Sequence, residues 1–150
     1  HLFEGLRFPV GRLAEDQDVI YKLIHRSQRI YVTEQPLYNY YQRDGSITAA
    51  QYYPRLIRDR HELWLKRLDF IREYYPDLEN YQIAQILGAA YVGIVKLEGN
   101  KQNGELKKKL ICFSNKYILK EKELSVLDRK IKLHYYCYPL FWLYVKLFIK

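Results

Sequence analysis

The chain has 150 residues, a length that suits one domain or one and a half. Apolar residues make up 49% and aromatic residues 16%, which excludes a disordered tail and a low-complexity linker. The two cysteines, Cys112 and Cys137, are too few for a disulfide scaffold or a four-thiolate metal site.

The net charge of +8 is carried entirely by residues 101–150, because basic and acidic side chains balance in residues 1–100. A local excess of this kind indicates one anionic surface or a solvated helix face. The lysines lack a recognition motif, so we do not expect nucleic acid to be a partner. The chain contains no Met and begins with His1, and we expect it to be a piece of a longer polypeptide.

Short elements with turn signals are predicted up to about residue 48. Pro and Gly place residues 8–12 in a loop. Glu15 and Asp16 open a helix, since the helix dipole favours acidic residues in the first turn. Residues 30–33 and 37–41 are β-branched or aromatic and predict two short strands. The apolar residues of the predicted helix fall on one face, at Val19, Ile20, Leu23 and Ile24.

Longer helical patterns follow from residue 49 onwards. Apolar residues recur at helical spacing, and Pro or Gly residues separate the segments. The predicted fold class is therefore mainly α with a small α+β part, a helix plus two strands followed by a bundle of four to five helices. The helices are expected at 54–75, 78–97 and 105–117, with two more in 124–149 divided near Pro139.

The Glu15–Asp16 pair is the first candidate for chemistry. At a helix N-terminus the dipole and the free N–H groups keep both carboxylates ionised. One of them can then accept a proton while the other is held by hydrogen bonds. The alternative is a capping pair with no chemical role, because acidic first turns are common.

The order of motifs in residues 1–48 resembles a known family. Residues 2–12 (LFEGLRFPVGR), Glu15-Asp16, residues 34–40 (EQPLYNY) and residues 43–47 (RDGSI) resemble the C-terminal end of the catalytic domain of bacterial family 2 glycosyltransferases. These enzymes have the GT-A fold and build capsule, exopolysaccharide and related cell-surface glycans. The resemblance implies that residues 1–48 end such a domain and that residues 49–150 are a helical extension.

The resemblance also implies roles for single residues. Asp16 would be the catalytic base that takes a proton from the acceptor hydroxyl during inverting sugar transfer, and Glu15 would support it. Arg43 and Ser46 would contact the leaving diphosphate of the nucleotide-sugar donor. Alternatively, Arg43 pairs with Asp44 in a solvated loop and Ser46 caps a helix.

The family also requires an upstream nucleotide-binding half with an Asp-x-Asp metal site. Asp16-Gln17-Asp18 has that spacing, but it lies within the base motif, so we do not expect a metal there. A divalent metal, Mg²⁺ or Mn²⁺, is expected only in the longer protein, and this chain alone is expected to be inactive. The partners implied are a nucleotide-sugar donor and a glycan or lipid-linked acceptor.

Residues 129–146 combine basic and aromatic side chains, which favour the membrane–water interface. The apolar run 135–145 is too short to span a bilayer, so we expect an interfacial helix or, alternatively, a core helix of the extension. The first interpretation places the protein in the cytoplasm, peripheral to the inner face of the cell membrane. The residues expected at the interface are Lys130, Lys132, Trp142 and Tyr144.

A second function, from a different class, is a non-catalytic helical module. It would serve membrane docking, homo-oligomer formation or contact with other assembly enzymes.

Overall fold

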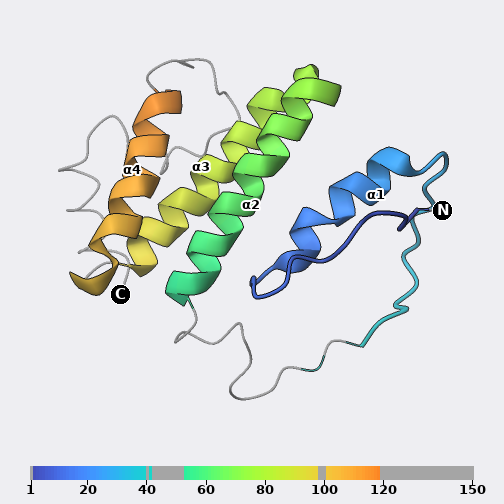
Figure 1. The fold of residues 1–150 in the computed structure, drawn as a ribbon, viewed down its shortest axis with the longest axis horizontal. Helices are drawn as coiled ribbons and strands as arrows, with labels where there is room; N and C mark the ends of the chain where they lie inside the picture. Colours follow the sequence, from blue (N-terminus) through green and yellow to red (C-terminus); the bar gives the residue numbers. More distant parts are fainter. Residues whose placement is uncertain (1, 40, 42–52, 98–100, 119–150) are drawn as a thin grey trace. The chain divides into compact units, whose positions relative to one another are not determined.

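The computed structural model describes residues 2–39, 41, 53–97 and 101–118. The chain divides into two compact units, His1–Arg67 and Leu68–Lys150. Figure 1 labels the helices α1 to α4 and colours them in the order of the sequence. Within the described residues all regular secondary structure is helical. The expectation of a mainly α protein is therefore confirmed for this part of the chain.

The first unit begins with a loop and two short helices. A 3-10 helix, η1, covers Glu15–Asp18, and helix α1 covers Ile20–Arg26. Ala14 precedes η1 in the left-handed region, with φ 58° and ψ 38°, and its carbonyl accepts the N–H of Gln17 at 3.1 Å. The predicted start of a helix at Glu15 is thus confirmed, although its first turn is 3-10 and the α-helix follows.

The two strands predicted after this helix are absent from the described residues. Residues 30–33 and 37–39, together with Tyr41, have no regular structure, while residue 40 lies outside the description. Tyr31 is 90% exposed and Tyr38 is 81% exposed. Strand propensity is realised only when the side chains pack against neighbouring strands, and no such neighbour exists within the described part. The prediction of strands was wrong for these residues.

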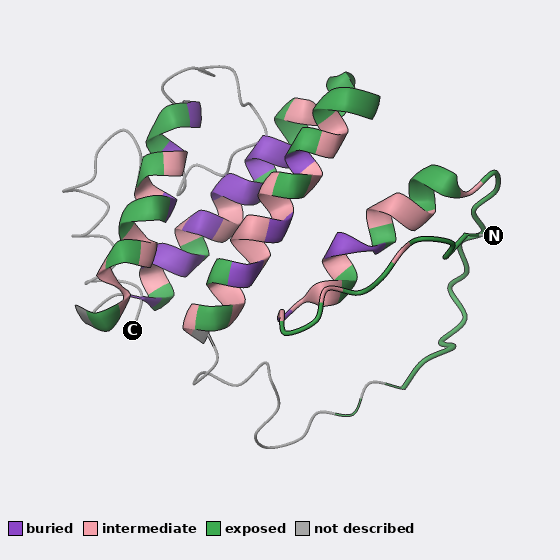
Figure 2. Ribbon diagram, viewed as in Figure 1, coloured by how far each residue is buried: buried purple, intermediate pink, exposed green. Residues whose placement is uncertain are grey.

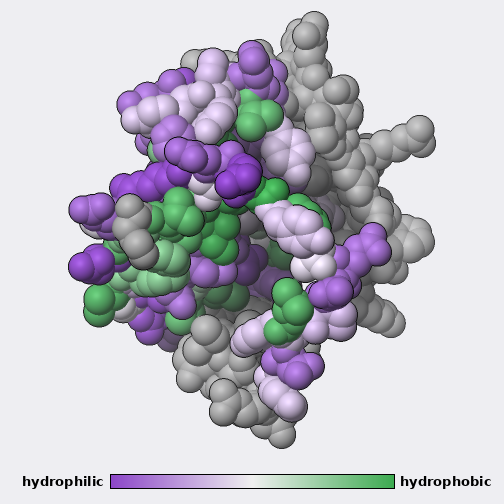
Figure 3. All heavy atoms as spheres, turned by 90° about the vertical axis from the view of Figure 1, so that its right-hand side faces the viewer, coloured by the Kyte–Doolittle hydropathy of each residue, from purple (hydrophilic) through white to green (hydrophobic). Residues whose placement is uncertain are grey.

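The predicted apolar face of the first helix is buried only in part. Val19 is 1% exposed, whereas Ile20 and Ile24 are 48% and 52% exposed. Helix α1 has only seven residues, and none of them is buried. Figure 3 shows apolar side chains at the surface of the face that it draws.

Helix α2 covers Tyr53–Tyr74, so its residues up to Arg67 belong to the first unit and the rest to the second. Pro54 stands near its start, where a missing N–H is tolerated. Pro76 follows its end and opens the short 3-10 helix η3, Pro76–Leu78. The expected helix over 54–75 is confirmed within one residue at each end.

The second unit is built around helices α3 and α4. Helix α3 covers Glu79–Lys96, the 3-10 helix η4 covers Lys101–Asn103, and helix α4 covers Gly104–Ile118. Helices α3 and α4 pack against each other. Figure 2 shows buried residues along α3 and on α4, and the fully buried side chains of the unit include Ile83, Ile86, Leu87, Ile94 and Leu110.

Arg72, near the end of α2, contacts both α3 and α4 in the described part of the second unit. Its Nε donates to Glu79 at 2.7 Å, and its Nη2 donates to the hydroxyl of Tyr117 at 2.9 Å. The hydrogen bonds that Arg72 donates to Glu79 and Tyr117 raise the pKa of Arg72, so it remains a cation. The start of α3 and the end of α4 are thereby tied to the same side chain.

None of the helices in the described part of the chain is both long enough and apolar enough to cross a membrane. The two helices predicted in 124–149 lie outside the described residues.

Candidate functional site

The structure places Glu15 and Asp16 in adjacent positions of η1. The side chain of Glu15 is half-buried, while Asp16 is exposed. The carbonyl of Asp16 accepts the N–H of Val19 at 3.0 Å, which fixes the backbone at this position. Exposure is a requirement for a carboxylate that must meet a substrate hydroxyl, and Asp16 satisfies it.

Asp18, two residues later, is in a different environment. It is buried, and its Oδ2 pairs with Lys22 Nζ at 3.1 Å. Asp16 is exposed and Asp18 is buried, so the two carboxylates lie in different environments. Across the described ranges, no three His, Cys, Asp or Glu side chains are grouped so that they could hold a metal.

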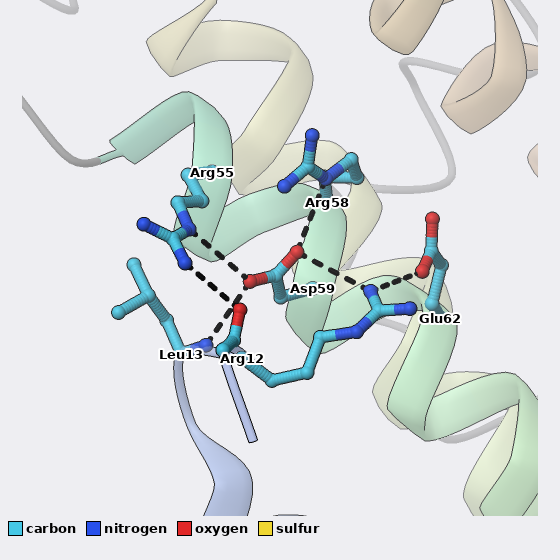
Figure 4. A network of polar contacts seen from close by, with 7 residues as sticks. Arg12, Leu13, Arg55, Arg58, Asp59 and Glu62 are labelled. Carbon is cyan, nitrogen blue, oxygen red and sulfur yellow. Dashed lines mark hydrogen bonds and ion pairs between the residues drawn. The ribbon is translucent and has the colours of Figure 1, made fainter. Parts of the chain in front are cut away.

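A network of polar contacts lies next to η1 in the first unit, centred on Asp59 of α2 (Figure 4). The Asp59 side chain is 0% exposed. Its Oδ2 accepts the backbone N–H of Leu13 at 3.0 Å, and its Oδ1 accepts Arg58 Nε at 3.1 Å and Arg12 Nη1 at 3.4 Å. Arg55 Nε completes the group at 3.8 Å from Oδ2.

The same arginines make further contacts that hold the loop before η1. Arg12 also donates to Glu62 of α2. Arg55 donates to the carbonyl of Gly11 at 2.8 Å, and Gly11 itself has a φ of 71°, which glycine adopts readily. Residues 11–13 are therefore attached to α2 through both backbone and side chains.

Two opposing effects set the protonation of Asp59. Burial by itself raises the pKa of this carboxylate, but the hydrogen bond from Leu13 and the contacts with Arg58 and Arg12 outweigh it, and the net pKa is lowered. The hydrogen bond with Glu62 is the main cause that raises the pKa of Arg12. Both shifts favour the charged forms, the carboxylate of Asp59 and the guanidinium of Arg12.

A second contact with α2 holds η1 through the side chain of Gln17. The indole N–H of Trp64 on α2 donates to the side-chain oxygen of Gln17. The guanidinium of Arg67 lies over the Trp64 ring, 5.2 Å from its centroid. Asp16 is thus an exposed residue between two attached ones, Leu13 and Gln17.

The first unit also contains an open cavity of about 800 Å³ near the end of α1. Arg26 at this site donates to the carbonyls of Leu2 at 3.2 Å and of Glu4. Glu15 and Asp16 are not among the described residues around it. The cavity is lined by Leu2, Glu4, Arg26, Ser27, Gln28 and Arg29.

The remaining predicted site residues lie outside the described part of the chain. They are Arg43 and Ser46 for the diphosphate, and Lys130, Lys132, Trp142 and Tyr144 for the membrane interface. Sequence reasoning missed Asp59, because an Arg- and Glu-rich helix face normally lies in solvent. The one signal in the sequence is that Arg55 and Arg58 stand four and one residues before it.

Comparisons of the chain with protein-family models, with curated proteins and with solved structures give no match in any of the three.

Proposed function

We propose that this chain is the C-terminal part of an inverting glycosyltransferase, with Asp16 as its general base. The enzyme would move a sugar from a nucleotide-sugar donor to a cell-surface glycan or a lipid-linked acceptor. The proposal rests on the motif resemblance of residues 1–48. It is supported by one structural observation: Asp16 is exposed on a turn whose neighbours Leu13 and Gln17 are both bonded to helix α2.

The proposed step needs a carboxylate that is accessible and held in place. Asp16 accepts the proton of the acceptor hydroxyl while that oxygen forms a bond to the anomeric carbon of the donor sugar. The bond from the same carbon to the diphosphate breaks, and the nucleoside diphosphate leaves with the electron pair. A base held in place contributes more than a free carboxylate, because misplacement by about 1 Å can cost roughly 100-fold in rate.

The other roles in the proposal belong to residues and chain segments outside the described structure. Arg43 and Ser46 are proposed to contact the leaving diphosphate, whose charge grows in the transition state. In the described residues no three His, Cys, Asp or Glu side chains are grouped to hold a metal, and Asp18 Oδ2 pairs with Lys22. The proposal assigns Mg²⁺ or Mn²⁺ to the nucleotide-binding half and derives no step from it.

The direct test is Asp16→Asn in a polypeptide that joins this chain to that nucleotide-binding half. Removing the base should lower the transfer rate about 100- to 10,000-fold, the range that general base catalysis contributes. Asp77→Asn is the matched control, because Asp77 is also exposed in a 3-10 helix, η3. The control variant should transfer sugar at the wild-type rate.

Transfer by Asp16→Asn at the wild-type rate would refute the proposal. A second measurement uses the 150-residue chain alone, incubated with UDP-sugars. Clear hydrolysis of the donor would contradict the assignment of donor binding to a separate half.

An alternative function is a non-catalytic helical module for membrane docking or protein–protein contact. It is favoured by exposed apolar side chains around the junction of α2 and α3 in the second unit, which are Tyr74, Tyr75, Leu78 and Tyr81. Under this alternative, Asp16→Asn would leave transfer unchanged. Tyr81→Ser would weaken binding of the chain to the membrane or to a partner protein.

We also propose that the protein is peripheral to the cytoplasmic face of the membrane, through Lys130, Lys132, Trp142 and Tyr144. Liposome flotation of the whole chain and of a chain ending at Leu127 tests this. Equal recovery on anionic vesicles would remove the membrane role.

A further inference from the structure

Asp59 is a buried carboxylate with every side-chain oxygen in use. Oδ1 accepts from Arg58 and Arg12, while Oδ2 accepts the Leu13 N–H and lies 3.8 Å from Arg55 Nε. With a side chain that is 0% exposed, it cannot meet a substrate itself. Its effect must therefore pass through the groups that it holds.

The group that Asp59 holds most directly is the backbone just before η1. Leu13 donates its N–H to Asp59 and is followed by Ala14, whose left-handed conformation turns the chain into η1. Asp16 lies three residues after Leu13 in the sequence. The hydrogen bond to Asp59 thus holds the backbone at the point where the loop turns into η1.

The residue that follows Asp16 in the sequence is attached to the same helix. Gln17 accepts from Trp64, which is five residues after Asp59 on α2. Two anchors on one rigid helix therefore enclose a stretch of five residues that contains an exposed carboxylate. A side chain on a free loop would not be held in this way, and sites supported by rigid elements are the more precise ones.

The buried charge is itself an argument for a positioning role. Taking a carboxylate out of water is costly, and an apolar pair of similar volume often stabilises a fold equally well. Unlike an apolar pair, the carboxylate orients three guanidinium groups and one backbone N–H at the same time. One of these groups, Arg55, in turn donates to the Gly11 carbonyl.

We infer that Asp59 is a positioning residue for Asp16, through the Leu13 N–H and the arginines at the start of η1. This inference rests on the proposed function, because it assigns the purpose of the network to the proposed base. It adds a residue of α2 to a site that the sequence motifs place wholly in residues 1–48.

The first experiment needs no catalytic activity and uses the 150-residue chain. Amide hydrogen exchange is measured in the wild type, in Asp59→Asn and in Asp69→Asn, the same change at an exposed carboxylate of α2. Asp59→Asn should speed exchange at Leu13–Val19 at least tenfold and leave the amides of α3 unchanged. Asp69→Asn should alter neither, and unchanged exchange at Leu13–Val19 in Asp59→Asn would overturn the inference.

The second experiment measures transfer in the longer polypeptide. Asp59→Asn should lower kcat about 10- to 100-fold with the donor KM within twofold, as expected for a displaced base. It should also lower the ratio of transfer to donor hydrolysis. Arg12→Met leaves Asp59 paired with Leu13 and Arg58, and it should lower kcat by a smaller factor. This variant keeps the test available if Asp59→Asn does not fold.

A variant that loses stability in another part of the protein separates positioning of Asp16 from a general effect on stability. Ile86→Ala opens a cavity in the second unit and should leave kcat unchanged in the folded protein. A wild-type kcat in Asp59→Asn, combined with faster exchange at Leu13–Val19, would overturn the positioning role. Failure of Asp16→Asn to affect transfer would instead refute the proposed function, so the two failures are separable.

Discussion

The backbone N–H of Leu13 donates a 3.0 Å hydrogen bond to the buried carboxylate of Asp59, a residue 46 positions later in the sequence. This contact joins the loop before η1 to helix α2 within the first unit. Among the described side chains of α2, Asp59 alone is both charged and buried, and the contact places it where the loop turns into a helix.

Removal of the Asp59 carboxylate should destabilise the first unit strongly. Asp59→Ala leaves the Leu13 N–H without its acceptor and three guanidinium groups without their common partner. We expect a loss of about 2–4 kcal/mol in the free energy of unfolding. Urea denaturation followed by circular dichroism measures it. Asp69→Ala should change stability by less than about 0.5 kcal/mol, because Asp69 is 78% exposed, and equal losses in both variants would contradict this account.

Stability should fall as the pH drops below about 6.5 because of His61. Burial lowers the pKa of this histidine, although the charge of Glu62 raises it in part. The unfolded chain therefore binds a proton at a higher pH than the folded chain does, and the stabilisation is complete only above the unfolded pKa. Thermal unfolding at pH 7.5 and pH 5.5 should give a smaller difference in Tm for His61→Gln than for the wild type.

Arg72 and Tyr117 should be energetically coupled across the second unit. Their hydrogen bond is 2.9 Å long, but the Arg72 side chain is 39% exposed, so solvent screens part of the interaction. A double-mutant cycle with Arg72→Met and Tyr117→Phe should give a coupling of about 0.5–1 kcal/mol. The exposed pair Glu105–Lys108 on α4 is the comparison, and its coupling should be below about 0.5 kcal/mol.

Replacement of Ala14 by glycine should stabilise the protein. Ala14 has a φ of 58°, a conformation that costs a residue with a Cβ roughly 1–2 kcal/mol. Glycine also loses more conformational entropy on folding than alanine does. After this cost is subtracted, we expect the free energy of unfolding to rise by about 0.5–1 kcal/mol. Ala89→Gly, inside helix α3, should instead lower the free energy of unfolding by about 1 kcal/mol. The two chemically identical changes are compared by the midpoint of urea denaturation.

The long helices could be predicted from the sequence because their signals are local. Leu110 and Tyr117 recur at helical spacing in α4 and are buried as the pattern indicates. Pro76 marks the end of α2 for a reason that needs no tertiary contact. Periodicity over 15 residues or more outweighs small differences in propensity between neighbouring residues.

The candidate site could be predicted only in part. The acidic turn at Glu15 and Asp16 is a local feature, and the structure has it. The Asp59 network could not be predicted, because its key partner, Leu13, is distant in the sequence and contributes only a backbone N–H. The strands expected around Tyr31 and Tyr38 were wrong because a strand depends on neighbours that these residues do not have within the described part of the chain.

The bond between Trp64 and Gln17 gives the molecule an optical probe of its own. An indole that donates to a side chain one residue after Asp16 changes its emission wavelength when that turn moves or when a bound molecule displaces water nearby. In a Trp142→Phe background, the fluorescence of a single native tryptophan would therefore follow ligand arrival at the acidic turn in real time, with no attached dye.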